Sequence, residues 1–272
     1  MWSDVAELRQ FYDSHLGQVT RHLIRRQLRA LWPDVRGLSV LGLGYATPYL
    51  RQFRDEAERV LAFMPAAQGV VSWPADGRNL VALVDETELP LPNYSVDRVL
   101  LVHALECGEQ LRDLLRECWR VMAAGGRLLA VVPNRRGIWA RTDRTPFGQG
   151  VPYSPSQLAR LLRENMFVTT QSSRALFIPP TRSGTLLRTA PVWERIGQRW
   201  FTTFSGVVMV EAEKQIYAAS MPRPRKKRRA AVVLPFPRPA TGGMMPGQLS
   251  PSQIGPSRKT PTPEPPGSPQ GA

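Results

Sequence analysis

Short apolar runs alternate with stretches of helical periodicity through most of the chain, and this alternation constrains the fold more than any other feature. Apolar residues recur at helical spacing at 109–122 and again after Ser154-Pro155, which is a typical helix start. Between and before such stretches, buried strands are predicted at 38–44, 59–64, 79–84, 96–103 and 128–132. Strands that alternate with helices form a mostly parallel sheet with helices on both faces. The sequence therefore predicts an α/β domain.

The two ends of this domain have their own patterns. Residues 4–32 carry apolar side chains at spacings of three to five, which predicts one N-terminal helix. Two further strands are predicted at about 167–178 and 206–217, with only a short helical stretch around 191–200 between them. Because so little chain separates these strands, we expect them to pair antiparallel at one edge of the sheet.

The composition changes sharply after about residue 219. Residues 220–272 hold nine Lys and Arg, one acid (Glu264) and 13 of the 26 prolines. Such a segment cannot bury enough apolar surface to offset the entropy lost on ordering. We therefore expect an N-terminal helical segment at 1–36, an α/β domain at 37–219 and a disordered, basic, proline-rich tail.

Several classes of protein are excluded by simple features of the sequence. No run of about 18 apolar residues exists, so no transmembrane helix is expected. The first residues lack a basic start followed by an apolar stretch, so no secretory signal is expected. Cys107 and Cys118 form neither a disulfide framework nor a zinc motif, so we expect no metal site and a cytoplasmic location. The tail run Arg223–Arg229 resembles a polybasic patch for nucleic acid or an acidic membrane surface, although most such runs are simply solvated.

A glycine turn after the first strand is the first candidate site. Gly42 and Gly44 precede Thr47-Pro48, which suits the start of a helix. Ligands of open α/β sheets bind beyond the carboxyl ends of the strands. Glycines let the backbone approach a ligand, and a helix N-terminus favours a negative group. A turn without a ligand is equally compatible with so short a motif.

A second block carries a family resemblance. Residues 85–97 read DETELPLPNYSVD and resemble a signature of class I S-adenosylmethionine-dependent methyltransferases of the type 11 group. Residues 111–132 are similar to that family's next helix, Gly-Gly turn and strand. The resemblance covers roughly residues 37–180. It implies a Rossmann-like class I methyltransferase fold, with a mostly parallel seven-stranded sheet and an antiparallel edge strand.

The resemblance also implies roles in binding S-adenosylmethionine. Asp85 matches the acid that accepts from the adenine amino group, and the backbone N–H of Glu86 matches the group that reaches the adenine ring. Gly42 and Gly44 match the turn on the methionine side. His103 matches the position that faces the cofactor from the end of the fourth strand. It is the candidate general base, with a satisfied, partly buried histidine as the alternative.

The sequence departs from the family pattern at two binding positions. Gly42 stands where the family usually has an acid, and the bulky Tyr45 follows Gly44. Met64 stands near the position of the acid that holds the ribose hydroxyls. Loss of the two charge-assisted hydrogen bonds to the ribose, each worth about 1.5–3 kcal/mol, would weaken cofactor binding roughly 10²- to 10⁴-fold. Tyr45 offers a stacking surface or a hydroxyl as a replacement.

The loop after the fifth strand is the third candidate site. Its four arginines, whose forked side chains suit carboxylates and phosphates, are Arg135, Arg136, Arg141 and Arg144. Trp139 and Phe147 would stack on a planar group of an anionic substrate. The alternative is a solvated loop whose Trp packs on the core.

Two functions follow from these observations. One is an S-adenosylmethionine-dependent methyltransferase that acts on an unidentified, anionic acceptor. The other is a catalytically inactive binding or scaffold protein with a degenerate cofactor site, which the substitutions at Gly42 and Met64 favour. A nucleic-acid-binding module rests only on the positive charge.

Overall fold

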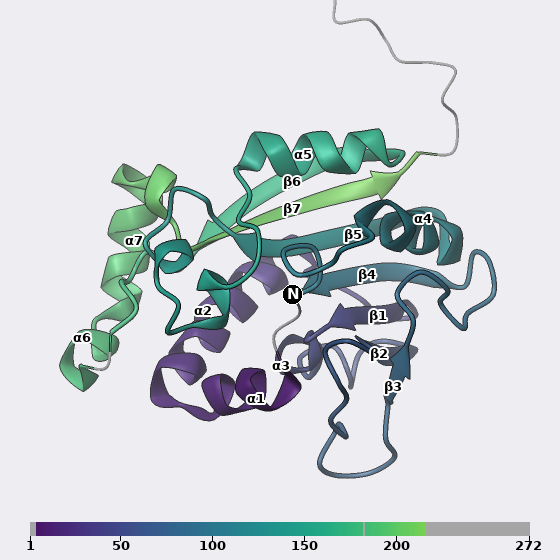
Figure 1. The fold of residues 1–272 in the computed structure, drawn as a ribbon, viewed down its shortest axis with the longest axis horizontal. Helices are drawn as coiled ribbons and strands as arrows, with labels where there is room; N and C mark the ends of the chain where they lie inside the picture. Colours follow the sequence, from purple (N-terminus) through teal and green to yellow (C-terminus); the bar gives the residue numbers. More distant parts are fainter. Residues whose placement is uncertain (1–3, 182, 216–272) are drawn as a thin grey trace, which may run out of the picture. The chain divides into compact units, whose positions relative to one another are not determined.

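The computed structural model describes residues 4–181 and 183–215, and these form a seven-stranded sheet covered by helices (Figure 1). The strand order is β3-β2-β1-β4-β5-β7-β6. Strands β1 to β5 run parallel to one another, whereas β7 is antiparallel to both β5 and β6. The bounds are β1 (Ser39–Gly44), β2 (Arg59–Pro65), β3 (Val81–Val84), β4 (Val96–Val102), β5 (Met122–Pro133), β6 (Phe167–Ala175) and β7 (Val207–Lys214). The predicted fold class is confirmed, with the antiparallel strand placed just inside the edge strand β6.

Helices cover both faces of the sheet and create two hydrophobic cores. On one face α1 (Val5–Asp13), α2 (His15–Leu31) and α3 (Thr47–Leu50) pack against alternate strand residues such as Val40. On the other face α4 (Leu111–Val121) and α5 (Pro155–Glu164) pack against the residues between them, such as Leu41. This division follows from the pleat, because successive side chains of a strand point to opposite faces.

The predicted single helix over 4–32 is wrong, because the chain breaks at Ser14. The Ser14 hydroxyl accepts a hydrogen bond from the Gly17 amide at 3.0 Å, which makes Ser14 the N-cap of α2. A side chain at Gly17 would collide with the carbonyl of Phe11, so the glycine permits the two helices to meet closely. The break turns α1 away from the direction of α2.

Three other predicted boundaries also differ from the structure. The helix expected from Thr47-Pro48 is a single turn that ends at Leu50. Strand β5 begins at Met122 rather than near 128, so Gly125 lies within the strand, with φ 72°, and does not end the preceding helix. The strand expected from residue 79 begins at Val81. In contrast, α5 begins directly after Ser154 as predicted, and Ser154 and Gln157 form a capping box.

The helices α6 (Gly184–Arg188) and α7 (Ala190–Trp200) lie between β6 and β7 in the chain. A buried carboxyl attaches α7 to the end of β6: Glu194 Oε1 accepts from the Phe177 amide at 2.7 Å. Burial raises the pKa of Glu194 to about 7.

None of the helices in residues 4–181 and 183–215 is long and apolar enough to span a membrane. The tail 220–272, with the run Arg223–Arg229, lies outside the described residues, so its disorder stays a prediction.

The raised pKa of Glu194 predicts a pH dependence of stability. A carboxyl with a pKa near 7 in the folded protein and 4.5 in the unfolded chain contributes stability below pH 4.5 that is lost as the pH rises to 7. Because Glu194→Gln cannot titrate, the fall in unfolding free energy across this range should be about 2–3 kcal/mol smaller in the variant. Urea denaturation at several pH values measures it. Parallel pH profiles of the two proteins would contradict the assignment.

Candidate functional site

Helix α1 lies at the carboxyl ends of the central strands, where ligands of such sheets bind (Figure 1). Its first residue is held by the segment after β2, because the Val5 amide donates to the Gln68 carbonyl at 2.9 Å. Its last turn carries Phe11, whose ring packs edge-on against Phe147 with a centroid distance of 6.1 Å. The helix therefore spans from the end of β2 to the loop after β5.

A buried cluster of Tyr12, Tyr45, Tyr49 and His103 lies beneath α1, and we call it the tyrosine–histidine cluster. The Tyr12 hydroxyl lies 2.9 Å from the Tyr49 hydroxyl and 2.8 Å from His103 Nε2. The Tyr45 ring stacks on the Tyr12 ring at a centroid distance of 5.6 Å and an angle of 23°. Burial raises the pKa of Tyr45 to about 12 and that of Tyr12 well above its usual value, which keeps both phenols neutral.

His103 is buried and both of its ring nitrogens have partners. Its side chain is 0% exposed, and its backbone has a positive φ of 51° directly after β4. Nδ1 lies 3.1 Å from Glu106 Oε1, and the Gln68 amide group donates to the His103 carbonyl at 3.3 Å. A carboxylate at Glu106 accepts from Nδ1–H, which leaves Nε2 to accept from Tyr12. This arrangement matches the alternative interpretation of His103 as a satisfied, buried histidine.

The glycine turn is filled by the chain itself. A Cβ atom at Gly42 would lie 2.6 Å from both Ala46 Cβ and Leu50 Cδ1, so these two side chains take the space that the glycine leaves. Gly44 has φ 80°, and a side chain there would collide with the Val102 carbonyl of β4. The Tyr45 amide donates to the same carbonyl at 2.9 Å. Both glycines therefore serve close packing of the turn against its neighbours.

The predicted adenine and ribose positions differ in accessibility. Met64 is buried at the end of β2 and contributes to the core. Asp85 is exposed, and its Oδ1 accepts from both the amide and the hydroxyl of Thr87, at 2.8 and 2.7 Å. These two hydrogen bonds lower the pKa of Asp85. Glu86 is partly exposed beside it. Asp97 accepts from the Ser39 amide at 2.9 Å, which attaches the start of β4 to the start of β1.

The loop after β5 separates its aromatic residues from its arginines. Trp139 and Phe147 are buried, and the Trp139 indole donates to the Ile178 carbonyl at 2.7 Å. Their rings pack within the fold and are not available to stack on a ligand. This agrees with the alternative stated above, a loop whose Trp packs on the core. The four arginines, Arg135, Arg136, Arg141 and Arg144, are all exposed.

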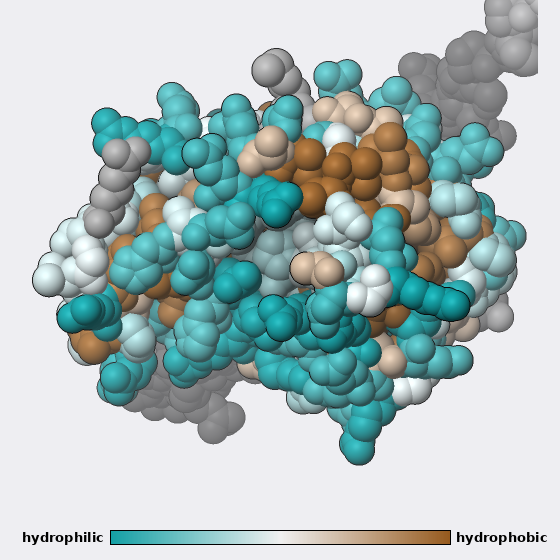
Figure 2. Space-filling view, turned by 90° about the horizontal axis from the view of Figure 1, so that it is seen from below, coloured by the Kyte–Doolittle hydropathy of each residue, from teal (hydrophilic) through white to brown (hydrophobic). Residues whose placement is uncertain are grey.

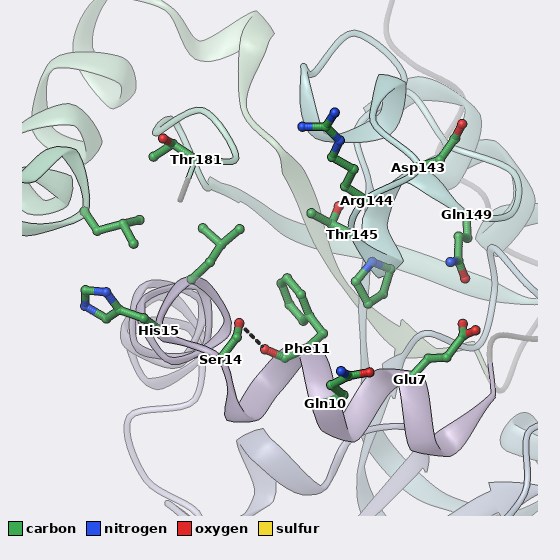
Figure 3. A pocket seen from close by; sticks show the side chains of 13 residues that line it. Glu7, Gln10, Phe11, Ser14, His15, Asp143, Arg144, Thr145, Gln149 and Thr181 are labelled. Carbon is green, nitrogen blue, oxygen red and sulfur yellow. Dashed lines mark hydrogen bonds between the residues drawn. The ribbon is translucent and has the colours of Figure 1, made fainter. Parts of the chain in front are cut away.

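One of those arginines borders a cavity of about 610 Å³ between α1 and residues 143–149 (Figure 3). Phe11 points from α1 toward the segment with Thr145, and Gln149 points from the opposite loop toward Glu7. The lining is mostly polar: Glu7, Gln10, Ser14, His15, Asp143, Arg144, Thr145, Gln149 and Thr181, with the apolar Phe11, Leu16, Pro146 and Leu187. Phe11 separates this cavity from Tyr12, its neighbour at 5.1 Å between ring centroids.

Sequence reasoning missed Tyr12, Tyr49, Gln68 and Glu106 as members of this region. Tyr12 belongs to the apolar stripe of the first helix and has no local mark of a polar role. Within residues 4–181 and 183–215, no three His, Cys, Asp or Glu side chains come together as a metal site requires.

Comparison with known proteins finds one matching family model. Residues 38–130 match the family model of the type 11 methyltransferase group, which is described as a methyltransferase domain. This part of the chain therefore matches a methyltransferase domain, as the resemblance in the sequence predicts. Among curated proteins, no sequence matches the chain.

Solved structures share the fold of this chain. A chain from a complex with the Haloferax volcanii Trm112 methyltransferase activator is 16% identical, with a TM-score of 0.56, and the match covers 79% of this chain and 100% of that one. An S-adenosylmethionine-dependent methyltransferase from Thermotoga maritima is 15% identical, with a TM-score of 0.54, and the match covers 78% of this chain and 96% of that one. At such identities the likeness shows the fold alone.

The residues at the cofactor position do not fit S-adenosylmethionine in this structure. The family resemblance places the methionine part against the glycine turn and the end of β4. That space holds the Tyr12 ring, which contacts Tyr45, Tyr49 and His103. The buried Met64 offers no group for the ribose hydroxyls.

The tyrosine–histidine cluster predicts that removal of the Tyr12 hydroxyl lowers the unfolding free energy. Tyr12→Phe leaves buried His103 Nε2 and the Tyr49 hydroxyl without this partner, so the unfolding free energy should fall by about 1–3 kcal/mol. Tyr94→Phe is the matched control, because Tyr94 is 60% exposed, and its effect should stay within about 0.5 kcal/mol. Urea denaturation of the three proteins measures both values. Equal stability of the Tyr12→Phe variant and the wild type would show that the buried hydrogen bonds do not form in solution.

Proposed function

We propose that this chain is a non-catalytic binding or scaffold protein that keeps the class I methyltransferase fold. The single observation that carries the proposal is the Tyr12 ring against Tyr45 and His103, where the family resemblance implies the methionine part of the cofactor. Tyr12 is itself buried, and its hydroxyl is hydrogen-bonded on both sides. A ligand would have to displace this side chain and break two buried hydrogen bonds before it could bind.

The energetic cost of such displacement adds to the missing binding groups. Breaking hydrogen bonds between buried groups costs about 1–3 kcal/mol for each group left without a partner. The absent ribose acid near Met64 removes a further source of affinity. Each 1.4 kcal/mol is about tenfold in affinity, so micromolar binding of the cofactor would become millimolar or weaker.

A binding role also agrees with the cavity beside α1. Its lining has side chains of both signs, with Glu7 and Asp143 opposed by Arg144. This composition suits a small polar ligand with both charged and neutral groups. The cavity is separate from the filled cofactor position, so occupancy of one does not require the other.

An active methyltransferase is the second candidate, and a specific observation favours it. Asp85 and Glu86, the residues that match the adenine site, remain accessible at the end of β3. In this alternative α1 moves away from the strand ends and carries Tyr12 with it. The acceptor would then approach from the side of the exposed arginines after β5.

Cofactor titration into the full chain separates the two candidates. We expect no binding of S-adenosylmethionine or S-adenosylhomocysteine below about 1 mM by isothermal calorimetry. Asp85→Ala tests the adenine position, and Asp55→Ala is its matched control, because Asp55 is also an exposed acid. Circular dichroism verifies that each protein is folded.

The outcomes are distinct. Absence of binding in the folded wild type supports the non-catalytic proposal. Micromolar binding that is lost in Asp85→Ala and kept in Asp55→Ala would overturn it and establish the cofactor site of the second candidate. The cytoplasmic location expected from the sequence stays a prediction.

A further inference from the structure

Helix α7 and the short helix η3 (Thr202–Phe204) expose an unusual number of large apolar side chains. Trp200 is 72% exposed, and Phe201 and Phe204 are each 56% exposed. Trp193, Ile196 and Val192 are exposed as well. In Figure 2, brown hydrophobic residues lie among hydrophilic ones at the left, the side on which Figure 1 shows α6 and α7. We call the six exposed residues Val192, Trp193, Ile196, Trp200, Phe201 and Phe204 the α7 surface.

The α7 surface is one face of an anchored helix. The opposite face is buried through Ala190, Glu194 and Gly197, at spacings of four and three. A side chain at Gly197 would collide with the Phe177 ring, so this face sits directly on the end of β6. Trp193 and Trp200, seven residues apart, therefore point away from the core because the other face is fixed.

The exposed charges within residues 183–206 are of one sign. Arg188, Arg195 and Arg199 are exposed on α6 and α7. The only acid between residues 183 and 206 is Glu194, and it is buried. No exposed carboxylate of this segment therefore opposes its arginines.

The loop after β5 adds two more positive charges at the same place. The Asn134 side-chain amide donates to the Thr203 carbonyl of η3 at 2.9 Å, which holds the loop against η3. Arg135 and Arg136 follow directly and are exposed. The four arginines predicted to bind an anionic substrate thus include two that directly follow the residue attached to η3.

We propose that the α7 surface binds the interface of an anionic lipid bilayer. Trp and Phe side chains are favoured at the boundary between headgroups and acyl chains, and an amphipathic helix lies in that plane with its apolar face inserted. Guanidinium groups beside it pair with lipid phosphates and gain from the negative surface potential. A protein groove would cover the aromatic residues equally well, but it gives no reason for a rim of arginines without an exposed acid.

This inference is independent of the proposed non-catalytic function, since it uses none of the residues at the cofactor position. It must be separated from the basic tail run Arg223–Arg229, which would also attract anionic vesicles. Attraction by the tail alone is electrostatic and is lost in high salt. Insertion of aromatic side chains persists in salt and places tryptophan in the acyl region.

The test uses the full chain and vesicle sedimentation. Vesicles of phosphatidylcholine with about a quarter phosphatidylglycerol are compared with pure phosphatidylcholine, at low and high salt. The triple variant Trp200→Ser, Phe201→Ser, Phe204→Ser should bind the anionic vesicles at least about tenfold more weakly than the wild type. The control variant Leu83→Ser, Tyr94→Ser removes two exposed apolar residues elsewhere and should bind like the wild type.

A spectroscopic arm identifies the inserted residues. Brominated phosphatidylcholine in the same anionic vesicles should quench the tryptophan fluorescence of the wild type. The variant Trp193→Phe, Trp200→Phe keeps an aromatic, apolar face, so its binding should fall far less than that of the triple variant, whereas this quenching should be lost. Binding that is equal in the wild type and the triple variant, or that vanishes when only the tail arginines and lysines are changed to glutamine, would overturn the proposal.

Discussion

The hydroxyl of Tyr12 is the contact on which the arrangement of the site depends. It joins the first helix to α3 through Tyr49 and to the end of β4 through His103. Because all three groups are buried, each would be costly to leave without a partner. The hydrogen bonds therefore fix α1 across the strand ends, where an open α/β sheet otherwise presents its ligand groove. The loop after β5 closes the same region from the other side through Phe147.

This constraint explains why the methyltransferase fold and the chemistry of the site point in different directions. The fold of the methyltransferase domain depends on the alternation of strands and helices, which the substitutions at the site leave intact. The glycines of the first turn still permit a close approach, but the approaching atoms belong to Ala46, Leu50 and Val102 of the same chain. A motif that elsewhere admits a ligand here improves internal packing.

Strands and most helices could be predicted from the sequence because their signals are local. Apolar runs mark the buried strands, and the capping box at Ser154 marks the start of α5. The break at Ser14 was missed because the apolar spacing continues through it, and only the cap and the close contact of Gly17 reveal it. The side chains that meet at the site were harder to predict than the helices and strands. The partners Tyr12 and His103 are 91 residues apart, and nothing near either one in the sequence marks the other.

Hydrogen exchange of α1 tests most directly whether the chain fills its own cofactor position in solution. The account predicts that the amides of residues 8–13 exchange as slowly as those of β4, and that saturating S-adenosylmethionine leaves their exchange unchanged. Rapid exchange of α1 in the free protein, or a change in its protection when the cofactor is added, would contradict the account. Either result would mean that α1 opens and that the groove beneath it is available.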